Sequence, residues 1–406
     1  MKDGFIRVAA ATPDIHVADP QYNSEQIIEL MEQGSARGVK VMAFPELCLT
    51  AYTCSDLFLQ ESLLREAKKE LKRILQASKS KDMILFVGMP WMHKGKLYNV
   101  AAVLNRGRIL GIVPKKHLPN YSEFYELRHF NPGMEKVEMT EWEGLQIPMG
   151  MKLLFSCRTM PELVLAAELC EDVWVPCPPS ISHALAGATV IANCSASDET
   201  TGKDQYRYNL ICGQSARLVC GYIYANAGEG ESTQDLVFGG QNIIAENGTC
   251  LVQSDRFKNA CICADLDLGR IISERRRMTT FRDEENRSAS YETVYFELNT
   301  EDSAKKDSKK AGQKRDELLR YIDPAPFVPH DAGQRERRCE EILSIQAMGL
   351  KKRLAHTNCK HAVIGLSGGL DSTLALLVTV RAFDMLQIPR ENIHCITMPC
   401  FGTTDR

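Results

Sequence analysis

The chain has 406 residues, of which 44% are hydrophobic and 25% are charged, and its formal net charge is −3. These values predict an ordinary soluble globular protein with two or three domains. The balanced charge argues against nucleic-acid binding, because such proteins carry a basic excess. No apolar stretch is long enough to span a bilayer, so we expect no membrane segment.

The fifteen cysteines are scattered and mostly lie inside apolar runs. Only Cys261 and Cys263 stand close together, and no CxxC pair accompanies them. This pattern argues against a zinc site or a disulfide scaffold and favours a reducing cytoplasm. Residues Met1–Gly4 lead directly into a strand-like run, so we expect no signal peptide.

Residues 1–298 alternate strand and helix signals, and we expect them to form one domain. Buried strands are predicted at Phe5–Ala11, Val39–Phe44 and Met83–Met89. The run Ser62–Ser78 has helical apolar spacing with lysines on its other face. Two hairpins are predicted, with turns at Asn105–Gly107 and Asn247–Gly248. Hairpins mixed with βα units predict an α/β fold in which two mixed sheets are covered by helices, an α-β-β-α sandwich.

The composition changes after residue 299. Residues 301–310 are charged and nearly devoid of apolar side chains, and Pro324, Pro326 and Pro329 follow. We expect 299–334 to be an exposed linker. A helix is predicted at Arg335–Thr357, and 335–406 should be the first part of a second domain.

The second domain contains the hexapeptide SGGLDS between an apolar run, His361–Leu366, and a helical segment, Thr373–Arg381. A strand, a glycine loop and a helix in this order can hold phosphate, because glycine N–H groups approach its oxygens closely and a helix N-terminus favours negative charge. The Walker lysine is missing, so the P-loop pattern does not fit. We expect a phosphate-binding loop made of Ser367, Gly368, Gly369, Leu370, Asp371 and Ser372.

Three strings in the first domain each follow a strand-like run, and they contain Glu46, Lys115 and Cys170. Together they supply the parts for amide hydrolysis by a thiol. The Cys170 thiolate would attack the amide carbonyl, and Glu46 would take the thiol proton and later activate water. Lys115 would stabilise the oxyanion. Nearby Glu168, Glu171 and Asp172 should disfavour a thiolate, and Lys115 should offset them.

These motifs resemble two known families. The loop SGGLDS is similar to the pyrophosphate loop of N-type ATP pyrophosphatases, which implies that Ser367–Ser372 bind ATP. The Glu, Lys and Cys strings, from Phe5 to about Phe296, resemble the nitrilase superfamily of carbon–nitrogen hydrolases, whose fold is an α-β-β-α sandwich. The two halves together, with the strings LPNYSEFYE, ELCEDVWVP and IGLSGGLDST, resemble the glutamine-dependent NAD synthetases. This resemblance implies a Rossmann-like second domain.

The resemblance implies roles for particular residues. Glu46, Lys115 and Cys170 would form a glutaminase triad. Lys115 is favoured over Lys116, because the family's lysine lies three residues before the leucine at position 118. The glutamine pocket would contain Tyr52, Tyr121, Glu126, Trp174 and Ser197, with Glu126 as the partner of the α-ammonium group.

The resemblance also implies substrates, cofactors and partners. ATP would adenylate the nicotinate carboxylate of nicotinic acid adenine dinucleotide, and ammonia from glutamine would displace AMP, giving NAD, AMP and pyrophosphate. Mg²⁺, held partly by Asp371, would neutralise the phosphates, whereas the glutaminase half would need no cofactor. The family forms homo-oligomers, often octamers, in the cytoplasm.

Two other interpretations remain open. The chain could be an amidase of the nitrilase superfamily that acts on another small amide, although SGGLDS argues against it. It could also be a regulatory or assembly module without chemistry, although the intact triad argues against that for the first domain.

A parallel nucleotide-binding sheet needs more strands than those before Arg406. We therefore expect the glutaminase activity without synthetase activity in these 406 residues.

Overall fold

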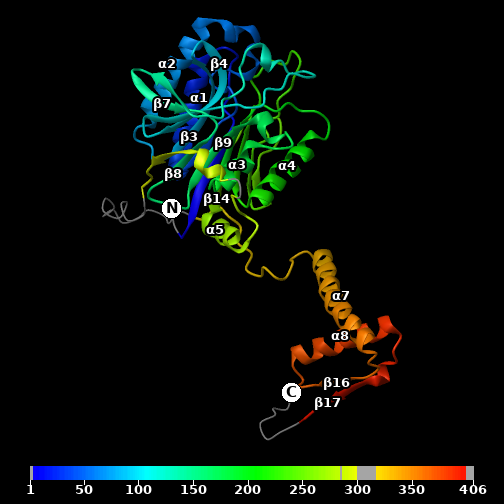
Figure 1. The fold of residues 1–406 in the computed structure, drawn as a ribbon. Helices are drawn as coiled ribbons and strands as arrows, with labels where there is room; N and C mark the ends of the chain where they lie inside the picture. The colour runs from blue at the N-terminus through cyan, green and yellow to red at the C-terminus, as the bar shows by residue number, and fades with distance from the viewer. Residues whose placement is uncertain (1–2, 284–285, 300–316, 399–406) are drawn as a thin grey trace. The chain divides into compact units, whose positions relative to one another are not determined.

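The computed structural model describes residues 3–283, 286–299 and 317–398, and it divides into two compact units, 1–320 and 321–406 (Figure 1). Residues 300–316 of the expected linker and the C-terminal residues 399–406 lie outside the described residues. The last residues of the first unit are held on it: Arg320 pairs with Glu246 at 2.7 Å, and Leu319 N donates to Asp265 at 2.6 Å.

The first unit contains a mixed sheet with the strand order β14-β1-β2-β3-β4-β5-β7-β6. Strands β1, β2 and β3 are parallel to one another, and β3, β4 and β5 form an antiparallel meander. The bounds are β1 Phe5–Ala11, β2 Val41–Ala43, β3 Ile84–His93, β4 Lys96–Asn105, β5 Arg108–Pro114, β6 Glu138–Trp142, β7 Leu145–Met149 and β14 Cys261–Asp267.

A second mixed sheet has the order β13-β12-β11-β10-β9-β8-β15. Its central strands β9, β10 and β11 are parallel, and β11, β12 and β13 run antiparallel. The bounds are β8 Leu153–Cys157, β9 Val164–Leu169, β10 Val190–Ser195, β11 Gly221–Asn226, β12 Ile243–Glu246, β13 Thr249–Gln253 and β15 Glu292–Phe296.

The two sheets pack face to face, and helices cover their outer faces (Figure 1). Along β1, Ile6, Val8 and Ala10 join a core cluster with residues of the second sheet, whereas Ala9 and Ala11 pack under the helices. Both faces are buried, which explains the continuous apolar runs of the central strands. The first sheet is covered by α1 Pro20–Ala36 and α2 Glu61–Ser78, and the second by α3 Pro179–Leu185 and α4 Lys203–Leu218. The expected α-β-β-α sandwich is confirmed.

Local patterns predicted several elements correctly. Helix α2 buries Leu63, Ala67, Leu71 and Ile74, the spacing of one helical face. Both expected hairpin turns are present, because Arg106–Gly107 and Asn247–Gly248 all have positive φ, as a two-residue type I′ turn requires. The strand expected at 39–44 is shorter, Val41–Ala43, and the strand expected at 83–89 extends to His93. Helix α5 Leu268–Arg277 was not expected.

In the second unit, α7 Ala332–Thr357 leads to β16 Ala362–Gly365, α8 Leu370–Leu386 and β17 Ile393–Ile396. Strands β16 and β17 are parallel, and α8 connects them, so the predicted strand, loop and helix are confirmed. A small core of Leu354, Ala382, Phe383 and Ile388 joins α7 and α8 to the strands. Strand β16, helix α8 and strand β17 form one parallel βαβ unit, the arrangement that nucleotide-binding sheets use.

Gly88 of β3 supports the segment that carries Glu46. A Cβ atom at Gly88 would lie 2.2 Å from the carbonyl oxygen of Pro45 and 2.4 Å from Leu47 N, closer than side chains tolerate. Gly88→Ala should therefore push this backbone aside and lower the free energy of unfolding by about 1–3 kcal/mol, measured by urea unfolding. The matched control is Gly213→Ala in α4, where the new methyl meets nothing within 4 Å; it should stabilise by about 0.5–1 kcal/mol. Equal stability of the two variants would contradict this prediction.

Candidate active site

The three predicted catalytic residues come from the ends of three strands in two sheets. Glu46 follows β2, Lys115 directly follows β5, and Cys170 follows β9 and opens the short helix η3 Cys170–Val173. Lys115 Nζ lies 2.6 Å from Glu46 Oε1, and both side chains are fully buried. Cys170 is 5% exposed and lies within the electrostatic reach of both residues. The residues predicted from sequence are therefore neighbours in space.

A second carboxylate completes the surroundings of Lys115. Glu126, in the short helix η2 Glu126–Arg128, accepts a hydrogen bond from Lys115 Nζ at 2.6 Å and another from the Tyr52 hydroxyl at 2.8 Å through the same oxygen, Oε1. Its other oxygen, Oε2, is buried and has no hydrogen-bond partner among the described residues. A buried carboxylate oxygen without a donor is unfavourable, so this atom is available to a ligand that carries N–H groups.

Glu46 is held from three directions. Besides Lys115, its Oε1 accepts from the Asn99 side chain at 2.6 Å, and its Oε2 accepts from Ala196 N at 3.0 Å. Asn99 lies on β4 of the first sheet, whereas Ala196 follows β10 of the second. The carboxylate of Glu46 therefore connects the two sheets and has little freedom to turn.

Burial and the neighbouring charges raise the pKa values of all three titratable groups, Lys115, Glu126 and Cys170. Burial alone would lower the pKa of the Lys115 ammonium, but the carboxylates of Glu126 and Glu46 outweigh it and hold that pKa well above its ordinary value. Burial raises the pKa of Glu126 in spite of the opposing charge of Lys115. Burial also raises the pKa of the Cys170 thiol, and Glu46 adds to this, while Lys115 acts in the other direction. Cys170 is therefore a protonated thiol beside a fixed carboxylate.

The backbone of Cys170 is strained and supported. Its φ is +40°, in the left-handed region that non-glycine residues rarely adopt. Cys170 N donates to Asn193 Oδ1 at 3.2 Å, and Asn193 in turn donates to the Tyr222 hydroxyl at 3.1 Å. Tyr222 donates to Glu168, which also accepts from Ser180 N at 2.8 Å. A buried network thus fixes the sharp turn on which the thiol is presented.

The three carboxylates expected around the thiol each have hydrogen-bond partners of their own. Asp172 accepts from the backbone N–H groups of Leu169 and His117, Glu171 accepts from the Tyr121 hydroxyl at 2.9 Å, and Glu168 belongs to the network below Cys170. The carboxylates that act most on the thiol pKa are Glu46 and Glu126. Lys115 lowers the pKa of the Cys170 thiol, which is the direction that the sequence analysis expected.

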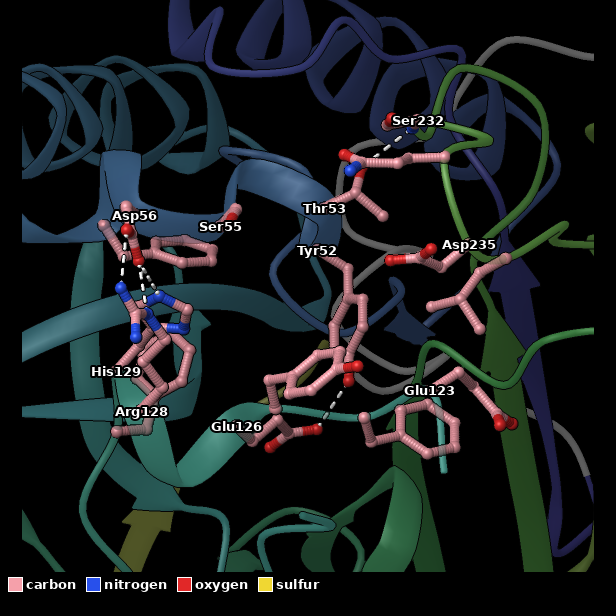
Figure 2. Close-up of a pocket in the computed structure, with 16 residues that line it drawn as sticks. Tyr52, Thr53, Ser55, Asp56, Glu123, Glu126, Arg128, His129, Ser232 and Asp235 are labelled. Carbon is pink, nitrogen blue, oxygen red and sulfur yellow. Dashed lines mark hydrogen bonds and ion pairs between the residues drawn. The ribbon is translucent and has the colours of Figure 1, made fainter. Parts of the chain in front are cut away.

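A cavity of about 360 Å³ opens beside this cluster, and Tyr52 and Glu126 line it together with Phe58, Phe124, Arg128 and Asp235. Figure 2 shows the Tyr52 ring directed at Glu126, with Asp56, Arg128 and His129 joined on another wall. Because Glu126 touches both the cavity and Lys115, it links the open space to the buried cluster.

The other predicted pocket residues lie close by but not on the cavity wall. Tyr121 is 55% exposed, and the ring of Trp174 stacks on Tyr206 with 5.4 Å between centroids. Ser197 is buried, and its hydroxyl accepts from Arg207 at 3.2 Å. The structure therefore places Tyr52 and Glu126 on the cavity and the other three around it.

Lys203, the first residue of α4, was missed by the sequence reasoning. Its ammonium lies 5.5 Å from the Trp174 ring and 5.9 Å from the ring of Phe124, a cavity residue, and it pairs with Asp198, next to Ser197. Its ammonium thus lies beside Trp174, a predicted pocket residue, and beside Phe124 on the cavity wall. A lone lysine at the start of a helix carries no sequence signal, because most such residues are solvated.

In the second unit, the loop Ser367–Ser372 connects β16 to α8 as expected. Gly368 has φ +78°, and Ser372 Oγ accepts from Ser367 N at 3.3 Å. Helix α8 begins at Leu370 without a side-chain cap, so Asp371 and Ser372 lie in its first turn rather than capping it. The loop is exposed at a helix N-terminus, where phosphate oxygens are favoured.

Asp371 is the acidic residue of this first turn. The described residues contain no cluster of three or more His, Cys, Asp or Glu that could hold a metal on its own. One carboxylate beside a phosphate loop nevertheless fits Mg²⁺, which binds through one or two carboxylates together with substrate phosphates.

Among the described residues, no helix is long and apolar enough to cross a membrane.

The fold and the buried lysine with its two carboxylates and thiol define a class of hydrolase. Residues 7–276 match the family model "Carbon-nitrogen hydrolase", and the chain belongs to this family. Residues 342–406 match the model "NAD synthase".

Relatives match across both units. A glutamine-dependent NAD(+) synthetase of Mycobacterium leprae is 40% identical over 99% of this chain and 58% of its own length, so the chain spans less than two thirds of such relatives. The structure of a glutamine-dependent NAD(+) synthetase from Cytophaga hutchinsonii matches 99% of this chain and 61% of its own, with 22% identity and a TM-score of 0.59. An amidase from Nesterenkonia matches 68% of this chain and 96% of its own, with 19% identity and a TM-score of 0.53. These structures support the fold.

Glu168 should make the stability depend on pH. Burial raises its pKa to about 7, so between about pH 4.5 and 7 the folded protein holds a proton that the unfolded chain releases. The free energy of unfolding should therefore fall as pH rises through this range, by at most about 3 kcal/mol from this group. In Glu168→Gln this part of the dependence should vanish, as measured by urea unfolding from pH 4.5 to 8. The exposed Glu297→Gln is the control, and curves for parent and Glu168→Gln that run parallel would contradict the assignment.

Proposed function

We propose that the first unit is a glutaminase that hydrolyses the side-chain amide of L-glutamine. The observation that carries this proposal is the convergence of Glu46, Lys115 and Cys170 at strand ends of two sheets, with Lys115 fully buried between two carboxylates. Support also comes from the family of the chain and from the printed names of its relatives, which are glutamine-dependent.

The proposed reaction uses a protonated thiol as its starting point. Because burial keeps the proton on Cys170, the nucleophile needs a base at the moment of attack, and Glu46 is the fixed carboxylate beside it. As the C–S bond forms, the proton moves to Glu46, and the amide oxygen becomes an oxyanion that the Lys115 ammonium stabilises. The C–N bond then breaks, and Glu46 returns the proton to the departing ammonia. Water, activated by Glu46, then adds to the thioester; the C–S bond breaks, glutamate leaves, and Glu46 returns the proton taken from water to the Cys170 thiolate.

The remainder of the substrate would occupy the cavity. The unpartnered Oε2 of Glu126 is suited to accept N–H groups from the α-ammonium of glutamine, with the Tyr52 hydroxyl beside it. Lys203, near the rings of Phe124 and Trp174, would attract the α-carboxylate. Tyr121 would close the pocket from its exposed side. A small amide such as acetamide has neither charged group, so glutamine should be the better substrate.

We propose further that the whole protein to which these residues belong couples this ammonia to NAD synthesis. ATP would adenylate the carboxylate of nicotinic acid adenine dinucleotide, releasing pyrophosphate, and ammonia would displace AMP to give NAD. The NAD synthase match and the SGGLDS loop at the N-terminus of α8 support a pyrophosphate site at Ser367–Ser372. Bound Mg²⁺, with Asp371 as one partner, would neutralise phosphate charge. Producing ammonia beside the adenylate raises its effective concentration.

We also propose a cytoplasmic homo-oligomer, and an octamer is its expected size. The fourteen described cysteines are all free, which suits a reducing compartment. Large apolar side chains are exposed on the segment between β5 and β6, among them Tyr121, Tyr125 and Leu127. Such residues favour contact with another protein surface.

Cys170→Ala should abolish release of glutamate from glutamine, because alanine has no thiol with which to form the thioester. The measurement is glutamate production by the purified chain, with folding checked by the thermal midpoint. The control is Cys177→Ala, an exposed cysteine outside the cluster, which should keep the parent rate. Glutamate release by Cys170→Ala at the parent rate would show that the nucleophile is another group.

The two neighbouring lysines should differ by orders of magnitude. Lys115 is buried between Glu46 and Glu126, whereas Lys116 makes a surface pair with Glu135 at 2.9 Å. Lys115→Ala should lower kcat for glutamine by about 10²–10³, the usual effect of losing one oxyanion contact. Lys116→Ala, the matched control, should stay within about twofold, because exposed pairs contribute little. Similar kcat values for the two variants would refute the choice of Lys115.

A further inference from the structure

A buried carboxylate outside the catalytic cluster holds one wall of the cavity. Glu231 lies between β11 and β12 and is 8% exposed. Its Oε1 accepts from Tyr52 N at 2.8 Å, and its Oε2 accepts from Thr53 N at 2.9 Å and from Thr53 Oγ1 at 2.5 Å. Both carboxylate oxygens therefore accept hydrogen bonds from a segment that lies about 180 residues away in the chain.

The segment that Glu231 holds has no cap of its own. The short helix η1 Tyr52–Leu59 starts after Ala51, whose φ of +79° is in the left-handed region, and no side chain of this segment caps its first N–H groups. Glu231 supplies that cap from another part of the chain, and its negative charge suits a helix N-terminus. Without it, two buried N–H donors would lose their partners.

The same contact reaches the catalytic cluster through Tyr52. The Tyr52 hydroxyl donates to Glu126 Oε1, which also accepts from Lys115. On the other side, Ser232 N donates to Thr53 Oγ1 at 2.8 Å, and residues 232 and 234–236 line the cavity (Figure 2). Glu231 thus ties two walls of the cavity together and fixes the backbone that aims the Tyr52 ring at Glu126.

We propose that Glu231 is a positioning residue for substrate binding, which keeps Tyr52 and Glu126 aligned where the amino-acid end of the substrate binds. The proposal rests on the proposed glutaminase function. Glu46, Lys115 and Cys170 are fixed by other contacts, through Asn99, Ala196 and Asn193. Loss of the Glu231 carboxylate therefore affects binding of glutamine more than the chemical step.

The test compares Glu231→Gln with Glu70→Gln. Glutamine at 231 keeps the size but turns an NH₂ group towards N–H donors. Glu70 is also a buried carboxylate, 3% exposed, but it accepts from Ser24 between α1 and α2, away from the cavity. We expect Glu231→Gln to raise KM for glutamine about tenfold with kcat within threefold, and Glu70→Gln to lower the thermal midpoint without changing KM. A parent KM in Glu231→Gln would overturn the proposal.

A double variant tests whether Glu231 acts through Tyr52. If it does, Tyr52→Phe and Tyr52→Phe/Glu231→Gln should have KM values within about twofold of each other, because the second change removes nothing further. Effects that multiply would overturn the proposal. Glu231→Asp, which keeps the charge, should recover part of the KM effect.

Hydrogen exchange makes the test independent of activity. Peptides covering residues 50–60 should exchange faster in Glu231→Gln than in the parent, whereas Glu70→Gln should leave them unchanged. If the parent does not hydrolyse glutamine, the proposed function fails. Hydrogen exchange then tests only whether Glu231 holds the backbone of Tyr52. Unchanged exchange in Glu231→Gln would show that it does not.

Discussion

The buried ammonium of Lys115 is the group on which the rest of the site depends. A lysine removed from water is stable only if its charge is paired, and here two carboxylates, Glu46 and Glu126, each lie 2.6 Å away. Each carboxylate needs further donors in turn, which Asn99, Ala196 and Tyr52 supply. One buried positive charge thus dictates the placement of side chains from both sheets.

The sandwich makes this arrangement possible because it brings strand ends of two sheets together. Strands β2 and β5 deliver Glu46 and Lys115 from the first sheet, and β9 delivers Cys170 from the second. Asp172 strengthens the junction, since its carboxylate receives N–H groups both from Leu169 and from His117, two residues after Lys115. The Cys170 thiol and the Lys115 ammonium are therefore held by one short set of contacts between the two sheets.

The sequence allowed the sandwich, the helix α2, the I′ turns and the residues of the cluster to be predicted, because apolar periodicity, turn chemistry and strand-end residues are local patterns. The partners of the buried carboxylates could not be predicted. Glu231 meets Tyr52 across about 180 residues, and Asp172 meets His117 across 55. A local pattern shows a charged residue near a cysteine but not the donor that will satisfy it. For this reason the sequence did not show that Glu46 and Glu126 act most on the thiol pKa, and Lys203 was missed.

The left-handed backbone at Cys170 means that the residue best for stability at this position differs from the residue that the proposed chemistry requires. A non-glycine residue in this conformation carries about 1–2 kcal/mol of strain, which glycine would not. Glycine has no thiol, so a variant chosen only for resistance to heat would lose the proposed nucleophile. Selection for stability and selection for chemistry therefore act in opposite directions on the same codon, and the buried network below Cys170 offsets part of that conflict without removing it.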